Sequence, residues 1–482
     1  MCSGDPVPGG AQHAHAESGS SPARKRRREC PHLVRGMHVN NVQPGGNAFA
    51  FAGGQQRRLA GLGQLSVLTD ELLLDVWRFL SMESVARLSC LSYFAYALSE
   101  HDDLWRTLVL REAPAHLDFD SSWKQTYVTS TGCTVRLVPL KLTGVFSDAL
   151  FQPWLNATRD ISSRWLLNST IDRRSANDLS VDEFIGKYER PNVPVVITDV
   201  VNRWPAFTKW TPEYLSDTFA DTPVNVQVID MTMRSFWTYA AQSTDETPLY
   251  MFEKAFADKA PSLADDFAVP VYFRDDLFEL LGADRPDHRW MVAGPERSGS
   301  TFHQDPNSTS AWNAVITGRK KWIMYPKECV PPGVCPSEDG AEVVTPLSLM
   351  EWFSTFYMET QQPGAPQPLE VIVEPGEVIF VPNGWWHCVL NLEPSIAITQ
   401  NFVSPRNLLN VLRFANDNPD LVSGYRGDTP LGQRLADEVN RTHPGLIDQL
   451  RSQDQSARKR PASVWAACTA GVDTAPFAFC FE

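Results

Sequence analysis

The feature that most constrains this chain is a series of short apolar segments between residues 290 and 403, separated by Gly, Pro and Asn. Their β-branched and aromatic residues are typical of strands. The expected strands are 290–292, 311–316, 320–325, 370–373, 377–381, 387–390 and 396–403. Many short strands joined by turns predict a sandwich or barrel, jelly roll included. Because helical patterns flank them, the expected fold class is α+β.

Residues 65–110 have the spacing of helices rather than strands. Leu72, Leu73, Val76 and Leu80 predict one buried helix face, with Thr69 as its N-cap. A second helix is predicted by Val85, Leu88, Leu91 and Phe94, and a third short segment opens at Leu104 and Trp105. Further on, a helix at 181–185 capped by Ser180 precedes a strand at 194–197, and helical spacing returns after Pro405.

Length and composition indicate a folded chain with an unusual charge distribution. The 482 residues are 43% hydrophobic, which suits two or three domains. The net charge is −14, but residues 1–60 carry eight Lys and Arg against three Asp and Glu, leaving −19 on the remainder. We therefore expect a basic, disordered tail at 1–60 and an acidic body that does not bind nucleic acid.

Cysteine usage and hydropathy indicate the compartment. The nine Cys form no CxxC pair and are odd in number, so neither a disulfide framework nor a Cys-type zinc site is expected, and a reducing compartment fits best. No apolar segment is long enough to span a bilayer, and no secretory signal is recognisable. The run Arg24–Arg28 is a candidate nuclear-import signal, with an ordinary solvated charge cluster as the alternative.

A candidate metal site consists of His303, Asp305 and His387. Alternate residues of a strand share one face, so His303 and Asp305 can grip one cation, and His387 follows a Pro-Asn-Gly turn in a later strand. Two His and one carboxylate leave open positions on Fe(II) for a bidentate cosubstrate and O₂. The same His-x-Asp spacing at 101–103 and 116–118 falls in or after the helical module and lacks such a context.

A candidate anion site lies on the next strands. If Thr317-Gly318 is a two-residue hairpin loop, Asn313 and Lys320 share a face. A Lys inside a barrel needs an anion, which the distal carboxylate of 2-oxoglutarate would supply, and Thr399 could share it. The alternatives are an exposed Lys beside Arg319 and Lys321 and a plain barrel-lining Thr.

These segments resemble a family. Residues 290–306, 309–314, 318–322, 374–387 and 391–402, in this order, resemble a jumonji-C domain, most of all the bifunctional arginine demethylase and lysyl 5-hydroxylase branch once called the phosphatidylserine receptor. The resemblance covers about 176–410 and implies a double-stranded β-helix (jelly roll, cupin-like) with flanking helices. It implies Fe(II) ligands His303, Asp305 and His387, with 2-oxoglutarate and O₂ as cosubstrates.

The same resemblance implies a lining for the cavity. It assigns 2-oxoglutarate contacts to Asn313, Lys320, Thr399 and Tyr250, a polar contact to Ser300 where the family has Thr, and cavity walls to Trp290 and Phe252. The family member compared has long basic and Ser-rich extensions, whereas the segment after residue 410 is short and apolar-periodic here, which argues against nucleic-acid association.

The helical module resembles an F-box, which docks substrate receptors on the SCF ubiquitin-ligase adaptor. The resemblance rests on residues 68–74, 79–80, 85–92 and 103–105, and Thr69 replaces the usual Pro. The expected organisation is tail 1–60, F-box 61–115, linker 116–175, jumonji-C region 176–410 and C-terminal helical region 411–482.

The expected function is an Fe(II)- and 2-oxoglutarate-dependent oxygenase acting on protein in the nucleus. Its substrate would be a histone tail or another Lys/Arg-rich protein, which the acidic body would attract. Arginine demethylation and lysyl hydroxylation share the same metal and cosubstrate residues, so both remain open. Two alternatives are an SCF receptor whose jumonji domain only recognises its target, and a cupin-like metal protein that uses no 2-oxoglutarate.

Overall fold

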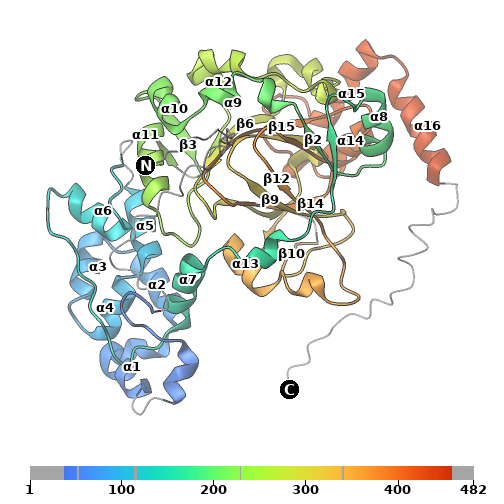
Figure 1. The fold of residues 1–482 in the computed structure, drawn as a ribbon. Coiled ribbons are helices and arrows are strands. Elements are labelled where there is room, and N and C mark those ends of the chain that lie inside the picture. The colour runs from blue at the N-terminus through green and yellow to red at the C-terminus, as the bar shows by residue number, and fades with distance from the viewer. Residues whose placement is uncertain (1–36, 51–53, 113–116, 228, 339–340, 459–482) are drawn as a thin grey trace, which may run out of the picture.

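The computed structural model describes residues 37–50, 54–112, 117–227, 229–338 and 341–458. Its centre is a pair of facing sheets, with helices α1–α7 on one side and α14–α16 on the other (Figure 1). No helix among the described residues has the length and apolar character needed to cross a membrane.

Eight strands form a double-stranded β-helix, as expected. Within the nine-stranded sheet the order β6-β15-β8-β13 faces the four-stranded sheet β12-β9-β14-β7. The chain changes sheet at every step except from β9 to β12. The strands are β6 Arg289–Gly294, β7 Gly299–His303, β8 Ser310–Thr317, β9 Lys320–Tyr325, β12 Leu369–Val373, β13 Val378–Val381, β14 Trp386–Asn391 and β15 Ser395–Phe402.

Further strands extend the larger sheet at both edges. β2 pairs with β13 and carries β1 in parallel, while β5 pairs with β6 and leads to β3 and β4. These strands are β1 Asp172–Ser175, β2 Val195–Thr198, β3 Pro223–Val226, β4 Ile229–Thr232 and β5 Met251–Glu253, and a separate pair is β10 Cys335–Pro336 with β11 Val343–Val344.

The connection at Thr317-Gly318 is not the expected hairpin. β8 pairs with β13 and β15, and β9 pairs with β12 and β14, so the turn carries the chain from one sheet to the other. Gly318 has a φ of 73°, and a Cβ there would lie 2.4 Å from the carbonyl oxygen of Pro394. Glycine is required because the arch combines left-handed backbone with close approach to another turn. Asn313 and Lys320 therefore do not share a hairpin face.

The larger sheet packs its outer face against aromatic side chains. Phe273 lies over the sheet and stacks on Trp312 and Phe380 at centroid distances of 6.1 Å each. The inner faces of the two sheets bury Val315, Trp322 and other apolar residues. Strands β8 and β9 are buried along almost their whole length, and Asn313, Lys320 and Lys321 are buried there among the apolar residues.

The described part of the N-terminal region contains seven α-helices, and the second expected helix is split in two, because α3 ends at Leu88 and α4 begins at Tyr93, with the 72% exposed Leu91 in the turn between them. Thr69 Oγ1 accepts a hydrogen bond from Leu72 N, which confirms the predicted N-cap. Of the predicted face, Leu73 is buried, together with Leu74 and Trp77, whereas Leu72 is 51% exposed and Val76 49%. The helices are α1 Gly54–Leu62, α2 Asp70–Arg78, α3 Met82–Leu88, α4 Tyr93–Ser99, α5 Asp102–Arg111, α6 Trp123–Ser130 and α7 Asp148–Thr158.

Ordered structure begins earlier than the composition predicted. Residues 37–50 and 54–60, assigned to a disordered tail, include the 3₁₀ turn Gly45–Phe49 and most of α1. Val42 is fully buried, and Gln43 N donates to the carbonyl of Val145 at 3.0 Å. Burial of one apolar residue and a few backbone hydrogen bonds can fix the position of a polar segment that has no hydrophobic periodicity. The basic run Arg24–Arg28 lies outside the described residues.

The remaining helices surround the sheets. Ser180 Oγ accepts a hydrogen bond from Glu183 N, so the predicted cap of α8 is confirmed. After β15, α14 and α15 bury their apolar faces together, which confirms the helical spacing beyond Pro405. These helices are α8 Val181–Phe184, α9 Ala206–Lys209, α10 Pro212–Phe219, α11 Met233–Gln242, α12 Phe256–Lys259, α13 Leu349–Thr355, α14 Leu408–Asp417, α15 Leu431–Thr442 and α16 Leu446–Arg458.

Candidate metal and cosubstrate site

Three potential metal ligands converge between the two sheets. His303 is the last residue of β7, and His387 lies directly opposite it on the neighbouring strand β14. Asp305 follows two residues later, and one ligand atom from each of the three side chains lies within 4.8 Å of the other two. Among the described residues this is the only such group of His, Cys, Asp or Glu. The predicted triad is thus assembled.

One detail of the prediction is wrong. Because β7 ends at His303, strand alternation does not orient Asp305. Its extended backbone, with φ −61° and ψ 142°, instead places it before the short 3₁₀ turn Pro306–Ser308. The other described His-x-Asp spacing, at 101–103, has a different role. Its Asp103, on α5, forms an ion pair with Arg78 at 3.1 Å. His116 lies outside the described residues.

Hydrogen bonds set the orientation of both imidazoles. His303 Nδ1 lies 2.8 Å from the carbonyl oxygen of Thr301, and His387 Nδ1 lies 3.0 Å from that of Trp385. A ring that donates from Nδ1 presents the Nε2 lone pair to a metal. Burial lowers the pKa of His387 well below its usual value, and the nearby His303 lowers it further. The neutral form that ligates a cation is therefore favoured.

The carboxylate of Asp305 is only partly compensated by neighbouring side chains. Its Oδ2 is buried and has no hydrogen-bond partner among the described residues. Burial raises the pKa of Asp305, and the nearby His303 and a hydrogen bond from Asn401 only partly oppose that effect. A buried carboxylate oxygen without a donor is costly unless a cation supplies the missing interaction. With two imidazoles beside it, this donor set fits a divalent metal such as Fe(II).

Lys320 is buried, and no negatively charged group among the described residues pairs with it. Its side chain is fully buried, and Nζ donates to Tyr250 Oη at 3.1 Å, Asn391 Oδ1 at 2.8 Å and Ser395 Oγ at 3.0 Å. All three acceptors are neutral, and burial lowers the pKa of Lys320 to about 7. A buried ammonium with neutral acceptors fits a carboxylate ligand, which would restore its charge.

The other predicted side chains line a cavity of about 290 Å³ that includes the triad. Asn313 projects into it with its Oδ1 buried and unpartnered among the described residues. Thr399 Oγ1 donates to the carbonyl of Trp312 at 3.1 Å, which leaves its lone pairs toward the cavity. The predicted residues lining this cavity are Tyr250, Phe252, Trp290, Ser300, His303, Asp305, Asn313, His387 and Thr399. Lys320 is not part of that lining and contacts it through Tyr250.

Sequence reasoning missed several residues of this site. Trp322 stacks on His387 with ring centroids 5.7 Å apart, and Asn401 lines the same cavity. Asn391 and Ser395 both hold Lys320. Alternation alone could have found the last two, because Asn391 is in phase with His387 along β14 and Ser395 with Thr399 along β15.

Comparison with known proteins agrees with this geometry. Residues 181–407 match the family described as Cupin-like domain. The chain is 42% identical to the arginine-specific demethylase JMJ22 of Arabidopsis thaliana over 450 residues, which are 91% of this chain and 89% of that protein. The chain belongs to this jumonji-C oxygenase family.

Two other relatives of the oxygenase support the cofactors. The bifunctional arginine demethylase and lysyl-hydroxylase psr-1 of Caenorhabditis elegans is 39% identical over 59% of this chain and 72% of its own length. The human 2-oxoglutarate and iron-dependent oxygenase JMJD4 is 30% identical over 55% of this chain and 70% of its own length. Together with the triad, these relatives establish an oxygenase dependent on Fe(II) and 2-oxoglutarate.

Proposed function

We propose that this oxygenase acts on arginine or lysine side chains of a basic protein, such as a histone tail, by arginine demethylation, lysyl hydroxylation or both. The observation that carries the proposal is the similarity to an arginine-specific demethylase along nearly the whole of both chains. The cavity beside the triad adds support, because the aromatic side chains of Trp290 and Phe252 line it. Aromatic faces favour cationic groups such as a methylated guanidinium.

The chain's own residues have separate tasks in this reaction. His303, Asp305 and His387 hold the metal, while Lys320 and Tyr250 anchor the cosubstrate carboxylate. When bound, iron and 2-oxoglutarate would allow O₂ to hydroxylate a nearby C–H bond: one oxygen atom enters succinate as 2-oxoglutarate loses CO₂, and the other enters the product. Hydroxylation of an N-methyl carbon releases formaldehyde, whereas hydroxylation of a lysine methylene leaves hydroxylysine.

Mass spectrometry of treated peptides tests the proposal. Methylarginine peptides and unmethylated lysine peptides are incubated with the full chain, Fe(II), ascorbate and 2-oxoglutarate, and His303→Ala is the control. A net loss of one CH₂ mass indicates demethylation, and gain of one oxygen mass indicates hydroxylation. Absence of both products on either class, while succinate still forms from 2-oxoglutarate, would contradict the proposed substrates.

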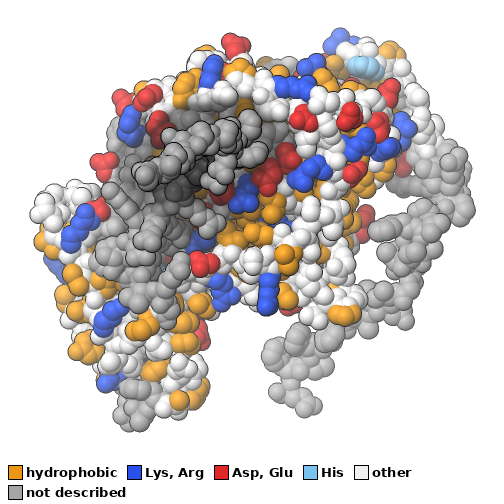
Figure 2. All heavy atoms as spheres, viewed as in Figure 1, with side chains coloured by type: hydrophobic (Ala, Val, Ile, Leu, Met, Phe, Trp, Pro, Cys, Tyr) orange, Lys and Arg blue, Asp and Glu red, His pale blue; other side chains and the backbone are white. Residues whose placement is uncertain are grey.

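A second proposal concerns residues 61–115, which we propose to act as an F-box that binds the SCF adaptor. It is favoured by apolar side chains left exposed on one face of α2: Leu72 is 51% exposed, Val76 49% and Phe79 88%. They recur at i, i+4 and i+7, opposite the buried face. Figure 2 shows hydrophobic side chains over this helical region, at the lower left. Such a patch is typical of a protein interaction site.

Adaptor capture tests this proposal. We expect Val76→Asp to abolish co-purification of the recombinant SCF adaptor with the full chain. Val138→Asp, at a position that is 78% exposed outside α2, is the matched control. Equal capture by wild type and Val76→Asp would refute the F-box assignment. If the cellular function survives His303→Ala but not Val76→Asp, the receptor role dominates over catalysis.

We also propose a nuclear location, supported by the basic run Arg24–Arg28 and by the chromatin substrate class. A fluorescent fusion in which these five residues are replaced by Gln tests it. We expect nuclear exclusion of the variant, and unchanged nuclear accumulation would contradict the proposal.

A further inference from the structure

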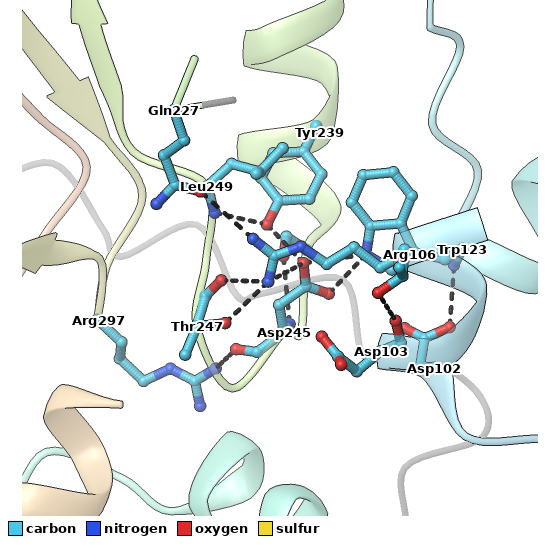
Figure 3. A network of polar contacts seen from close by, with 12 residues as sticks. Asp102, Asp103, Arg106, Trp123, Gln227, Tyr239, Asp245, Thr247, Leu249 and Arg297 are labelled. Atoms are coloured by element: carbon cyan, nitrogen blue, oxygen red, sulfur yellow. Dashed lines mark hydrogen bonds and ion pairs between the residues drawn. The ribbon is translucent and has the colours of Figure 1, made fainter. Parts of the chain in front are cut away.

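A buried aspartate joins the N-terminal helices to the segment that precedes Tyr250. The side chain of Asp245 is only 5% exposed. Trp123 Nε1, from α6, lies 3.0 Å from each of its carboxylate oxygens, and Tyr239 Oη, from α11, donates to Oδ2 at 2.7 Å. Tyr239 Oη in turn accepts from Leu249 N at 2.9 Å. These contacts hold residues 245–249 from two sides (Figure 3).

Arg106 on α5 holds the middle of the same segment. Its Nη1 donates to the carbonyl oxygen of Thr247 at 2.7 Å and to Thr247 Oγ1 at 2.8 Å, and it lies 3.9 Å from Asp245 Oδ2. The guanidinium points from α5 into the loop that carries Asp245 and Thr247 (Figure 3). Arg106 is 13% exposed, so these interactions are shielded from solvent. A planar guanidinium fixes several acceptors at once, which an ammonium cannot.

Arg297 connects this network to Asn391, another acceptor of Lys320. Its Nη2 donates to the carbonyl oxygen of Asp245 at 2.7 Å, and its Nη1 contacts that of Ala157 in α7. Its backbone N donates to the carbonyl of Asn391 at 2.8 Å. Asn391 and Tyr250 are two of the three acceptors of Lys320. The helical region is thus connected to the backbone of Asn391 through the hydrogen bonds of Arg297, and to Tyr250 through the chain segment 245–249 that it holds.

We propose that Arg106 is a positioning residue for the 2-oxoglutarate site: by holding residues 245–249 it places the Tyr250 hydroxyl against Lys320. The N-terminal helical region is then part of the cosubstrate site, and not only a docking module. This inference rests on the oxygenase assignment and is independent of the protein substrate. It also provides a route by which a partner bound to the helices alters cosubstrate affinity.

The test compares two arginines that are both partly buried in the helical region. Arg106→Gln removes the contact with the segment before Tyr250. Arg58→Gln is the control, because Arg58 pairs with Asp70 and donates to Leu68 O at 2.6 Å, within the helical region only. Binding of Mn(II), and of 2-oxoglutarate to the Mn(II)-loaded full chain, is measured by calorimetry, with KM and kcat for succinate formation and the melting temperature alongside.

We expect Arg106→Gln to raise the Kd and KM for 2-oxoglutarate up to about fivefold, no more than loss of the Tyr250 hydroxyl itself, with the Kd for Mn(II) and kcat at saturation changed less than about twofold. Arg106→Lys is expected to restore only part of the affinity, because it lacks the fork of donors. Arg58→Gln is expected to lower the melting temperature without changing the Kd for 2-oxoglutarate. A wild-type Kd in Arg106→Gln would overturn the proposal, as would equal losses in both variants.

If Arg106→Gln does not fold, a more conservative variant tests the same proposal. Thr247→Val keeps the side-chain volume and the carbonyl acceptor but removes the Oγ1 contact with Arg106. We expect it to raise the Kd for 2-oxoglutarate about threefold, the equivalent of roughly one weakened hydrogen bond. An unchanged Kd in Thr247→Val, in a protein that melts like the wild type, would also overturn the proposal.

Discussion

Lys320 and Lys321 are adjacent in β9, both fully buried, and differ in what neutralises them. On one face of the strand, Lys321 Nζ lies 2.7 Å from Glu370 Oε2 and donates to the carbonyl of Asn168 at 3.0 Å. On the other face, Lys320 contacts only the neutral acceptors Tyr250, Asn391 and Ser395. A buried cation with its own carboxylate is part of the scaffold, whereas one without a carboxylate is suited to an acidic ligand.

Substituting each lysine by methionine tests this difference most directly. We expect Lys320→Met to reduce 2-oxoglutarate turnover at least about a hundredfold, because the cosubstrate carboxylate loses a desolvated partner. Its folding should be nearly unaffected, since only neutral acceptors remain. Succinate formation and melting temperature are measured together. Turnover that persists unchanged would show that the cosubstrate does not use Lys320.

Lys321→Met is the converse experiment. We expect a loss of about 3–5 kcal/mol in the free energy of unfolding, because Glu370 stays buried without its cation. Urea unfolding measures the loss, and the double variant Lys321→Met with Glu370→Leu should recover most of it. If the fraction that remains folded keeps its affinity for 2-oxoglutarate, the two lysines have separate roles.

The pH dependence of cosubstrate binding separates the lysines further. Burial lowers the pKa of Lys320 from 10.5 to about 7 in the ligand-free protein, so its charge is lost as the pH rises above 7. The affinity for 2-oxoglutarate should then fall up to about tenfold per pH unit. The free protein should gain stability from this group over the same range, because the folded state favours neutral lysine. Calorimetry from pH 6 to 9 with Lys320→Arg, which stays charged, provides the control.

The smallest expected effect concerns the neutral acceptors. Tyr250→Phe removes one hydroxyl beside Lys320 and should raise the Kd for 2-oxoglutarate about fivefold, the equivalent of about 1 kcal/mol. The matched change beside Lys321 is Tyr357→Phe, whose hydroxyl donates to Glu370 at 3.0 Å. We expect that variant to leave cosubstrate binding unchanged. Equal effects of the two variants on the Kd would show that the two faces of β9 do not differ in their contribution to 2-oxoglutarate binding.

Local patterns predicted much of this molecule. Period-two alternation correctly placed Thr399 on the cavity side of β15, because side-chain direction in a strand depends only on neighbouring residues. Helix caps at Thr69 and Ser180 were predictable for the same reason. The triad was recognisable because each ligand lies in or beside a strand with a clear apolar pattern.

Other features depend on contacts that no local pattern contains. The turn at Gly318 has the composition of a hairpin, and only the pairing of β8 and β9 with other strands shows that it joins two sheets. Arg106 contacts Thr247 across 141 positions of sequence. Alternation puts Asn391 on the face of β14 that carries His387, but its contact with Lys320 in particular depends on the register of β14 against β9, which pairs the two residues.

The position of β7 at the edge of the smaller sheet determines how firmly this strand is held. β7 is an edge strand that pairs only with β14, and the ladder between them is interrupted after His387. Edge strands open more readily than central ones. Since His303 and His387 lie opposite each other in this ladder, a cation held by both would cross-link the two strands where their pairing is weakest. Metal loading would thereby slow amide hydrogen exchange in β7. The catalytic metal would also stabilise the edge of the smaller sheet.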